Sequence, residues 1–326
     1  MKKYFFLFCA VAVCVVLFAS ASSARDDNRV VIYSSVEDFR EEYFYGKLNE
    51  KFPDYEIVIE YLPTGNSAAK LKAEGLETEC DIVLALDVSY AASLSEFLAD
   101  LSAYDYSEYL DELVPTVKKY MIWERWSGCI VTNPKILSEK GLEVPKSYED
   151  LLKPEYRELI VMPNPKSSGT GYFFLFCLYK AWGADKTFEY FNKLAPNVLQ
   201  FTASGSGPIN ALMRGEAAIG FGMTFQAVTQ RNSGAPLEIT YFKEGAPYNS
   251  SAFAIIDGKQ NRQPVMDVFN FLRDVLVYDD KKLFSPEKIF KNQEIDIPNY
   301  PRVPYADMTG IDSEEEKAAL LAGWTY

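Results

Sequence analysis

The sequence predicts an α/β protein built from two lobes, each a mostly parallel sheet flanked by helices. Short β-branched or apolar runs alternate along the chain with stretches in which apolar residues recur at helical spacing, a pattern typical of βαβ units. The 326 residues also exceed what one hydrophobic core usually holds. With 22 Tyr, 22 Phe and 48% hydrophobic residues, the chain can fill two cores.

Residues 1–24 have the pattern of a secretory signal peptide. Two lysines precede an apolar stretch over 5–19, and small residues suitable for cleavage end at Ala21 and Ala24. The apolar stretch is shorter than the ~18–20 residues of a comfortable membrane span. We therefore expect an exported protein, periplasmic or extracellular. An uncleaved anchor and a lipid on Cys14 are the lesser alternatives, the second because a valine rather than a small residue precedes that cysteine.

The net charge argues against two classes of partner. The formal charge is −13, and removal of residues 1–24 takes away two lysines and no acid, which makes it −15. Such a surface repels nucleic acid and anionic lipid, so we expect neither as a partner. A small anion inside a cleft is not excluded, because local donors there outweigh the net charge.

The sequence contains no histidine, and this excludes several kinds of chemistry. Ser-His-Asp and Cys-His catalysis, HExxH metalloproteases and histidine-ligated zinc or manganese sites all need that residue. No spacing of carboxylates singles out an acid–base pair, and neither a dinucleotide fingerprint nor a Walker A sequence occurs. We therefore expect a protein that is not an enzyme and that holds no cofactor and no metal.

Three cysteines lie beyond residue 24, at Cys80, Cys129 and Cys177, all in apolar or strand-like contexts. An odd, sparse set of this kind is not a disulfide framework, so we expect buried free thiols. One disulfide with one thiol left over stays open as an alternative.

The elements follow one another in a regular order from residue 30 onward. Strands are predicted where β-branched or alternating runs occur, and helices where apolar residues return every three or four positions. The first series is strand 30–33, helix 37–52, strand 55–61, helix 66–77, strand 80–85 and helix 89–98.

A composition change at 123–132 leads into a second series of elements. Because no flexible linker separates the two series, the chain should cross between lobes twice, near 124–131 and 236–243. We expect a discontinuous first lobe, residues 28–125 and 241–326, around a second lobe of residues 126–240. The second series is strand 158–162, helices 170–182 and 185–195, strand 198–202, helix 207–214, strand 217–221, helix 224–232, strands 237–242 and 251–256, and helix 264–276.

Six of the predicted strands end in short turns rich in Ser, Thr and Gly. Ligands of open α/β sheets bind at the carboxyl ends of strands, so these turns are candidate parts of a site. Any single one is equally an ordinary helix cap. The turns are Ser34-Ser35, Thr64–Ser67, Asp87–Ser89, Ser167–Gly171, Thr202–Gly207 and Met223–Phe225.

The turn at Ser167–Gly171 is the most informative, because an apolar helix must begin there. The first turn of a helix has backbone N–H groups without intrahelical partners and the positive end of the macrodipole. Glycines allow a ligand to approach those N–H groups, and hydroxyls add donors, so the segment is suited to holding an anion.

In the order and spacing of these segments the chain resembles an extracellular solute-binding protein of an ABC importer. It is similar to the type II group that carries ferric ion, thiamine, 2-aminoethylphosphonate and hexose phosphates. The resemblance covers essentially all of the chain after the signal peptide. It rests on Val31–Ser35, Asp81–Val83, Ser168–Gly171, Ala211–Gly220 and Lys243–Gly245 with Tyr248.

The resemblance implies a type II periplasmic binding protein fold, with a solute held between two lobes that close by a hinge. It also implies delivery to an ABC permease in the cytoplasmic membrane, and we expect a monomer. Our first hypothesis is a small anionic solute: an organophosphate, phosphonate or sugar phosphate. The expected ligand-binding residues are Ser34, Ser35, Asn66, Ser67, Asp87, Ser168, Gly169, Thr170, Gly171, Thr224, Phe225 and Tyr248.

Other solutes stay open as alternatives: ferric ion with a synergistic anion, or an organic solute such as thiamine or a polyamine. The ferric-ion members hold iron with two adjacent tyrosines on the turn that reads Gly222–Phe225 here. This chain has no Tyr-Tyr pair and no histidine, so the coordination chemistry argues against iron. The identity of the solute does not follow from the sequence.

Overall fold

The computed structural model describes residues 28–295 and 297–326. The predicted signal peptide lies outside the described residues. Within them, no helix has both the length and the apolar composition needed to cross a membrane.

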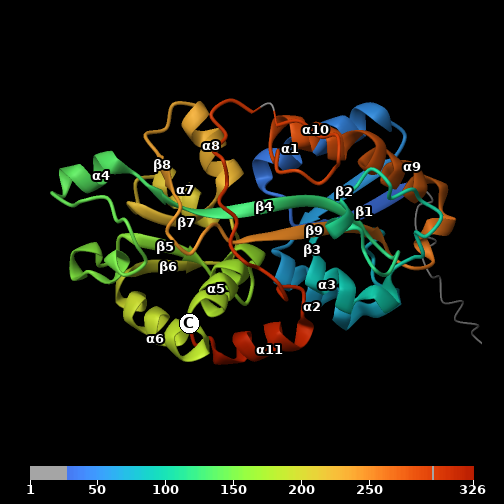
Figure 1. Cartoon of the computed structure of the whole chain (residues 1–326). Coiled ribbons are helices and arrows are strands. Elements are labelled where there is room, and N and C mark those ends of the chain that lie inside the picture. Colours follow the sequence, from blue (N-terminus) through green and yellow to red (C-terminus); the bar gives the residue numbers. More distant parts are fainter. Residues whose placement is uncertain (1–27, 296) are drawn as a thin grey trace, which may run out of the picture.

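The strands of the described residues form one continuous sheet in the order β2-β1-β3-β9-β4-β7-β5-β6, with β8 paired to β4 (Figure 1). The outer pairs are parallel, as predicted, but β9 and β4 run antiparallel to their neighbours. The strands are β1 Arg29–Ser34, β2 Glu56–Tyr61, β3 Ile82–Asp87, β4 Met121–Thr132, β5 Ile160–Pro163, β6 Val198–Thr202, β7 Ile219–Met223, β8 Glu238–Thr240 and β9 Tyr248–Ile255.

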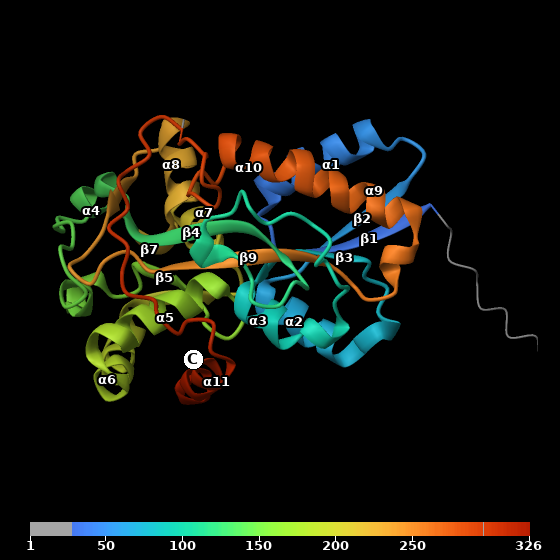
Figure 2. The same ribbon diagram turned by 45° about the vertical axis from the view of Figure 1, so that its right-hand side comes forward.

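Helices cover both faces of this sheet (Figures 1 and 2). In both views α1, α8, α9 and α10 lie on one side and α2, α3, α5, α6 and α11 on the other. The helices are α1 Asp38–Lys51, α2 Thr64–Glu74, α3 Val88–Ser93, α4 Pro134–Glu139, α5 Gly169–Trp182, α6 Ala184–Leu194, α7 Gly207–Met213, α8 Thr224–Asn232, α9 Gln263–Phe271, α10 Val277–Leu283 and α11 Glu314–Gly323.

The predicted elements are present, with differences at their ends and in the tail. The helix expected over 89–98 stops at Ser93 and is followed by a 3₁₀ turn. The helix expected over 264–276 continues through a π turn into α10. Neither α4 nor, in the polar tail, α11 was predicted from the sequence. The start of α11 is nevertheless marked, because the Ser313 side chain accepts a hydrogen bond from the backbone of Glu316.

Two large hydrophobic clusters lie side by side along the sheet, and β4 and β9 connect them. Residues 121–123 of β4 belong to the first cluster, whereas Trp126 and Ile130 belong to the second. A third, smaller cluster on the second half contains Cys129 and Val131. The side chains of Cys80, Cys129 and Cys177 are buried, as expected, and those of Cys129 and Cys177 are free thiols.

The exact division into lobes stays a prediction, and the clusters suggest how to refine it. Residues 252–256 belong to the first cluster, whereas Phe242 belongs to the second, so we propose that the return crossing lies within β9 rather than near residue 241. Met308, Leu320 and Trp324 also pack in the second cluster. We therefore propose that the C-terminal segment spans both halves instead of belonging to the first alone.

Gly128 lets β4 pass close to α5 in the second half. A Cβ atom at this position would lie 2.5 Å from Cε2 of Phe173 and 2.8 Å from Cζ of Phe174. We predict that Gly128→Ala lowers the free energy of unfolding by about 1–3 kcal/mol, because the core must shift to accept the methyl group. Urea denaturation measures this.

The matched control is Gly46→Ala in the middle of α1, where a Cβ would meet no atom within 4 Å. This variant should be unchanged or more stable by roughly 0.5–1 kcal/mol, since alanine is the better helix former. Equal losses in both variants would contradict the packing described here.

Candidate functional site

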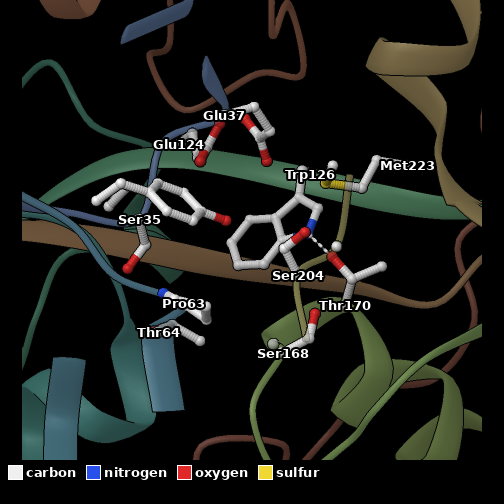
Figure 3. A pocket seen from close by; sticks show the side chains of 14 residues that line it. Ser35, Glu37, Pro63, Thr64, Glu124, Trp126, Ser168, Thr170, Ser204 and Met223 are labelled. Atoms are coloured by element: carbon white, nitrogen blue, oxygen red, sulfur yellow. Dashed lines mark hydrogen bonds between the residues drawn. The ribbon is translucent and has the colours of Figure 1, made fainter. Parts of the chain in front are cut away.

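A small cavity lined by both polar and apolar groups lies where the two halves of the molecule meet (Figure 3). Its volume is about 40 Å³, room for about three waters. The lining comes from the ends of β1, β2, β5, β6 and β7, from the bulge in β3, and from the crossing strand β4. The lining residues are Ser35, Glu37, Tyr61, Pro63, Thr64, Ala85, Glu124, Trp126, Ser168, Gly169, Thr170, Ser204, Gly205 and Met223.

The start of α5 forms one wall of the cavity. Ser168 caps this helix by accepting a hydrogen bond from the backbone N–H of Gly171. No acidic residue occurs in the first turn, so the positive end of the helix is not neutralised from within. The Thr170 hydroxyl accepts a hydrogen bond of 3.4 Å from the indole of Trp126, and only a glycine fits at position 205 against it.

The turns of the first half form the facing wall. The Ser35 hydroxyl donates to the carbonyl of Leu62 (2.8 Å), and the Thr64 hydroxyl accepts from the backbone of Asp87 (2.9 Å). The two walls meet where Gly65 N–H donates to the carbonyl of Ser167 at 3.2 Å. This backbone contact joins the two halves directly beside the cavity.

Two carboxylates, Glu37 and Glu124, line the upper side of the cavity in Figure 3. Behind them lies the fully buried Arg40, which donates to Glu37 at 2.8 Å and to Glu124 at 2.7 Å. The same guanidinium pairs with Asp280 at 2.8 Å, and it lies 4.9 Å from the ring centre of Phe225 in the second half. The Arg40 guanidinium thus forms ion pairs with three carboxylates.

Two irregularities in the sheet shape this site. The pairing of β4 with β9 shifts register between Ile122 and Glu124, and a bulge of this kind re-aims the side chains that follow. Glu124 and Trp126 both reach the cavity as a result. In β3 the register shifts between Val83 and Leu86, where Ala85 has a φ of 59°, a strained conformation for a residue other than glycine.

The two carboxyl groups differ in their titration. Burial, with a contribution from Glu124, raises the pKa of Glu37 to about 7 against the opposing effect of Arg40. Burial also acts to raise the pKa of Glu124, but Arg40 and Lys281 outweigh it, so that this pKa lies below its usual value. Near neutral pH the cavity therefore has one firmly ionised carboxylate and one that exchanges its proton.

Four of the expected ligand-binding residues line the cavity: Ser35, Ser168, Gly169 and Thr170. Thr64 and Ser204, from two of the predicted turns, line it as well. Because parallel strands end at a common edge, turns far apart in the sequence meet here.

The other eight expected residues do not line the cavity. Asn66 is exposed and Ser67 buried, while the Ser34 hydroxyl accepts from the backbone of Val36. Gly171 is packed against the backbone near Pro163. The remaining four are engaged elsewhere: Asp87 caps α3, Thr224 bonds Ser127, Phe225 packs beside Phe39, and Tyr248 packs on Tyr305.

Several lining residues were missed from the sequence, above all Glu37, Tyr61, Glu124 and Trp126. Tyr61 ends a predicted strand, which is a usable signal. The two residues on β4 lie within a strand, and nothing local marks them. Among the described residues, no group of three or more His, Cys, Asp or Glu could hold a metal ion.

We predict that Arg40→Gln lowers the free energy of unfolding by about 3–5 kcal/mol, because Glu37 and Glu124 lose the cation that they contact directly. Thermal and urea unfolding measure this. The matched control is Lys47→Gln on the same helix, whose side chain is 41% exposed and pairs with Glu50. It should change stability by less than about 1 kcal/mol. Similar losses for the two variants would show that the buried network contributes no more than a surface pair.

The family model described as bacterial extracellular solute-binding protein matches residues 96–274. An uncharacterised protein of Haemophilus influenzae is 29% identical over 254 residues, which are 74% of this chain and 72% of that protein. The spermidine/putrescine-binding periplasmic protein of Salmonella typhimurium is 26% identical over 252 residues. That match covers 74% of this chain but only 65% of the Salmonella protein.

Solved structures show the same fold. The periplasmic binding protein P5PA has a TM-score of 0.78 at 24% identity, over 91% of this chain and 98% of its own. AfuA from Actinobacillus pleuropneumoniae, with fructose-6-phosphate bound, has a TM-score of 0.79 at 23% identity, over 91% and 97%. The two-lobe fold is therefore confirmed, and the chain belongs to the bacterial extracellular solute-binding proteins.

Proposed function

We propose that this chain captures a small organic solute that carries a phosphate or phosphonate group together with a hydroxyl or amine, for import by an ABC transporter. One observation carries the proposal: the cavity has helix-start donors on one wall and a carboxylate pair, held by a buried arginine, on another. The family consists of solute-binding proteins, and the fold is that of proteins that deliver a solute to a permease.

The α5 wall supports an anionic group in several ways. The N–H groups of Gly169 and Thr170 lie in the first turn, where no carbonyl of the helix pairs with them. Hydroxyls of Ser168, Thr170 and Ser204 add donors. Charge-assisted hydrogen bonds contribute roughly 1.5–3 kcal/mol each. Three or four would give micromolar binding, about 8 kcal/mol, after the ordering costs of association.

The carboxylate wall is suited to the organic part of the solute. Glu124 is ionised and accepts hydrogen bonds from a hydroxyl or an ammonium group. Glu37, whose pKa is near 7, can accept or donate. Trp126 offers an aromatic face between the two walls. We propose that these residues contact the organic part of the solute, in place of Asp87 and Asn66 from the expected set.

The dimensions of the cavity imply that binding involves opening and closure. A volume of about 40 Å³ holds a compact group and not a whole sugar phosphate. The solute would enter an open form, and the halves would close on it, with a contact such as Gly65 to Ser167 forming as they meet. Transport energy comes from ATP hydrolysis by other subunits of the importer.

A polyamine is the second candidate. The cavity lining, all within the described part of the chain, has two carboxylates and two aromatic residues but no Lys or Arg. Such a set suits an ammonium group, and a relative at 26% identity is named spermidine/putrescine-binding. Against it, Arg40 already pairs with both carboxylates, and the start of α5 attracts anions rather than cations.

Calorimetric titration with glucose 6-phosphate, 2-aminoethylphosphonate, thiamine, putrescine and ferric citrate tests the proposal. We predict binding of a phosphate or phosphonate. We also predict that Thr170→Val weakens it about 10-fold, the value of one charge-assisted hydrogen bond. The matched control is Thr229→Val in α8, whose hydroxyl donates to its own helix. Binding of putrescine alone, with no effect of Thr170→Val, would contradict the proposal.

The pH dependence of binding gives a second test. The folded-state pKa of Glu37, about 7, lies above the ordinary value of 4.5, so the group is neutral below pH 7 and becomes charged as the pH rises through 7. Affinity for an anionic solute should therefore fall between pH 6 and pH 8 in the wild type relative to Glu37→Gln. The solute titrates in the same way in both measurements, so its own effect cancels in the ratio of the two affinities. A polyamine would show the opposite trend, and parallel pH profiles would exclude a role for Glu37.

A further inference from the structure

Lys317 of the C-terminal helix α11 is almost completely buried, with 4% of its side chain exposed. A lysine is seldom buried to this extent without a partner. Its ammonium group donates to the Ser89 hydroxyl at 2.6 Å and lies 3.5 Å from Oδ1 of Asp87. The tail of the chain thus places a cation against the polar turn that follows β3.

The same ammonium group lies between the two halves of the molecule. It is 3.5 Å from the ring centre of Tyr90 in α3 and 4.6 Å from that of Tyr172 in α5. Tyr90 packs against the first hydrophobic cluster, and Tyr172 belongs to the second. Both views show α11 on the side of the sheet that α3 and α5 cover (Figures 1 and 2).

Asp87 connects this lysine to the cavity. Its Oδ2 accepts a hydrogen bond of 2.6 Å from Asn249, and a Cβ on Gly169 would lie only 3.1 Å from that oxygen. Gly169 is the first residue of α5 and lines the cavity. A buried carboxylate therefore lies against the helix start that we assign to the anion, and its charge would repel that anion if nothing balanced it.

We propose that Lys317 is a specificity-determining residue that acts through Asp87. Its ammonium neutralises the carboxylate behind the first turn of α5 and so lets that turn accept an anion. The inference rests on the proposed function. It assigns to the C-terminal helix, which lies outside the region matched by the family model, a share in solute selection.

The test compares Lys317→Met with the double variant Asp87→Asn/Lys317→Met at one fixed pH. The titrants are glucose 6-phosphate, 2-aminoethylphosphonate and putrescine. We expect the single variant to bind the anion at least about 10-fold more weakly and the double variant to regain most of the loss. A purely structural role would weaken anion and putrescine alike. Melting temperatures report whether each variant folds. If Lys317→Met does not fold, the double variant, in which both charges are removed, is compared with the wild type instead.

Lys135→Met on α4 is the matched control, because it changes the net charge equally at a side chain that is 73% exposed. It should leave every affinity unchanged. The wild type is measured first, so failure of the proposed function is seen before any variant is compared. If the wild type binds putrescine only, Lys317→Met should tighten that binding; if it binds none of the three, both proposals fall. Unchanged affinity in Lys317→Met, or no recovery in the double variant, overturns this inference alone.

Discussion

Charge compensation beside the cavity is the constraint on which the rest of this site depends. Arg40 is fully buried and holds Glu37, Glu124 and Asp280 within hydrogen-bond distance. Buried charges are tolerated only when they are paired, so the arrangement of α1, β4 and α10 around this guanidinium follows from electrostatics as much as from packing. As a result, the acceptors on this wall of the cavity, Glu37 and Glu124, are paired with a cation that lies behind them.

The sequence was sufficient for the fold and for one wall of the site. The alternation of strands and helices predicted the layers, and the Ser168-Gly-Thr helix start predicted the α5 wall, because N-caps and strand-end turns are local signals. Glu124 and Trp126 could not be found in this way. They reach the cavity through a register shift between β4 and β9, strands that lie far apart in the sequence.

Asp87 shows that a local sequence signal can also single out a residue that does not line the cavity. Its place in a polar turn suggested a ligand contact, yet its carboxylate bonds Ser89 and Asn249 and lies beside Lys317. Only the tertiary structure brings the C-terminal helix to this turn. Lone polar residues after a strand are thus ambiguous between a cap and a ligand contact, and distant partners decide which role they take.

The proposed function requires that the start of α5 holds an anionic group while the carboxylates hold a hydroxyl or an amine. A crystal structure with 2-aminoethylphosphonate or glucose 6-phosphate tests it most directly. We expect phosphorus-bound oxygens within hydrogen-bond distance of the N–H groups of Gly169 and Thr170, and the other end of the solute at Glu37 and Glu124. An ammonium group at the start of α5, or a solute bound outside this cavity, would contradict it.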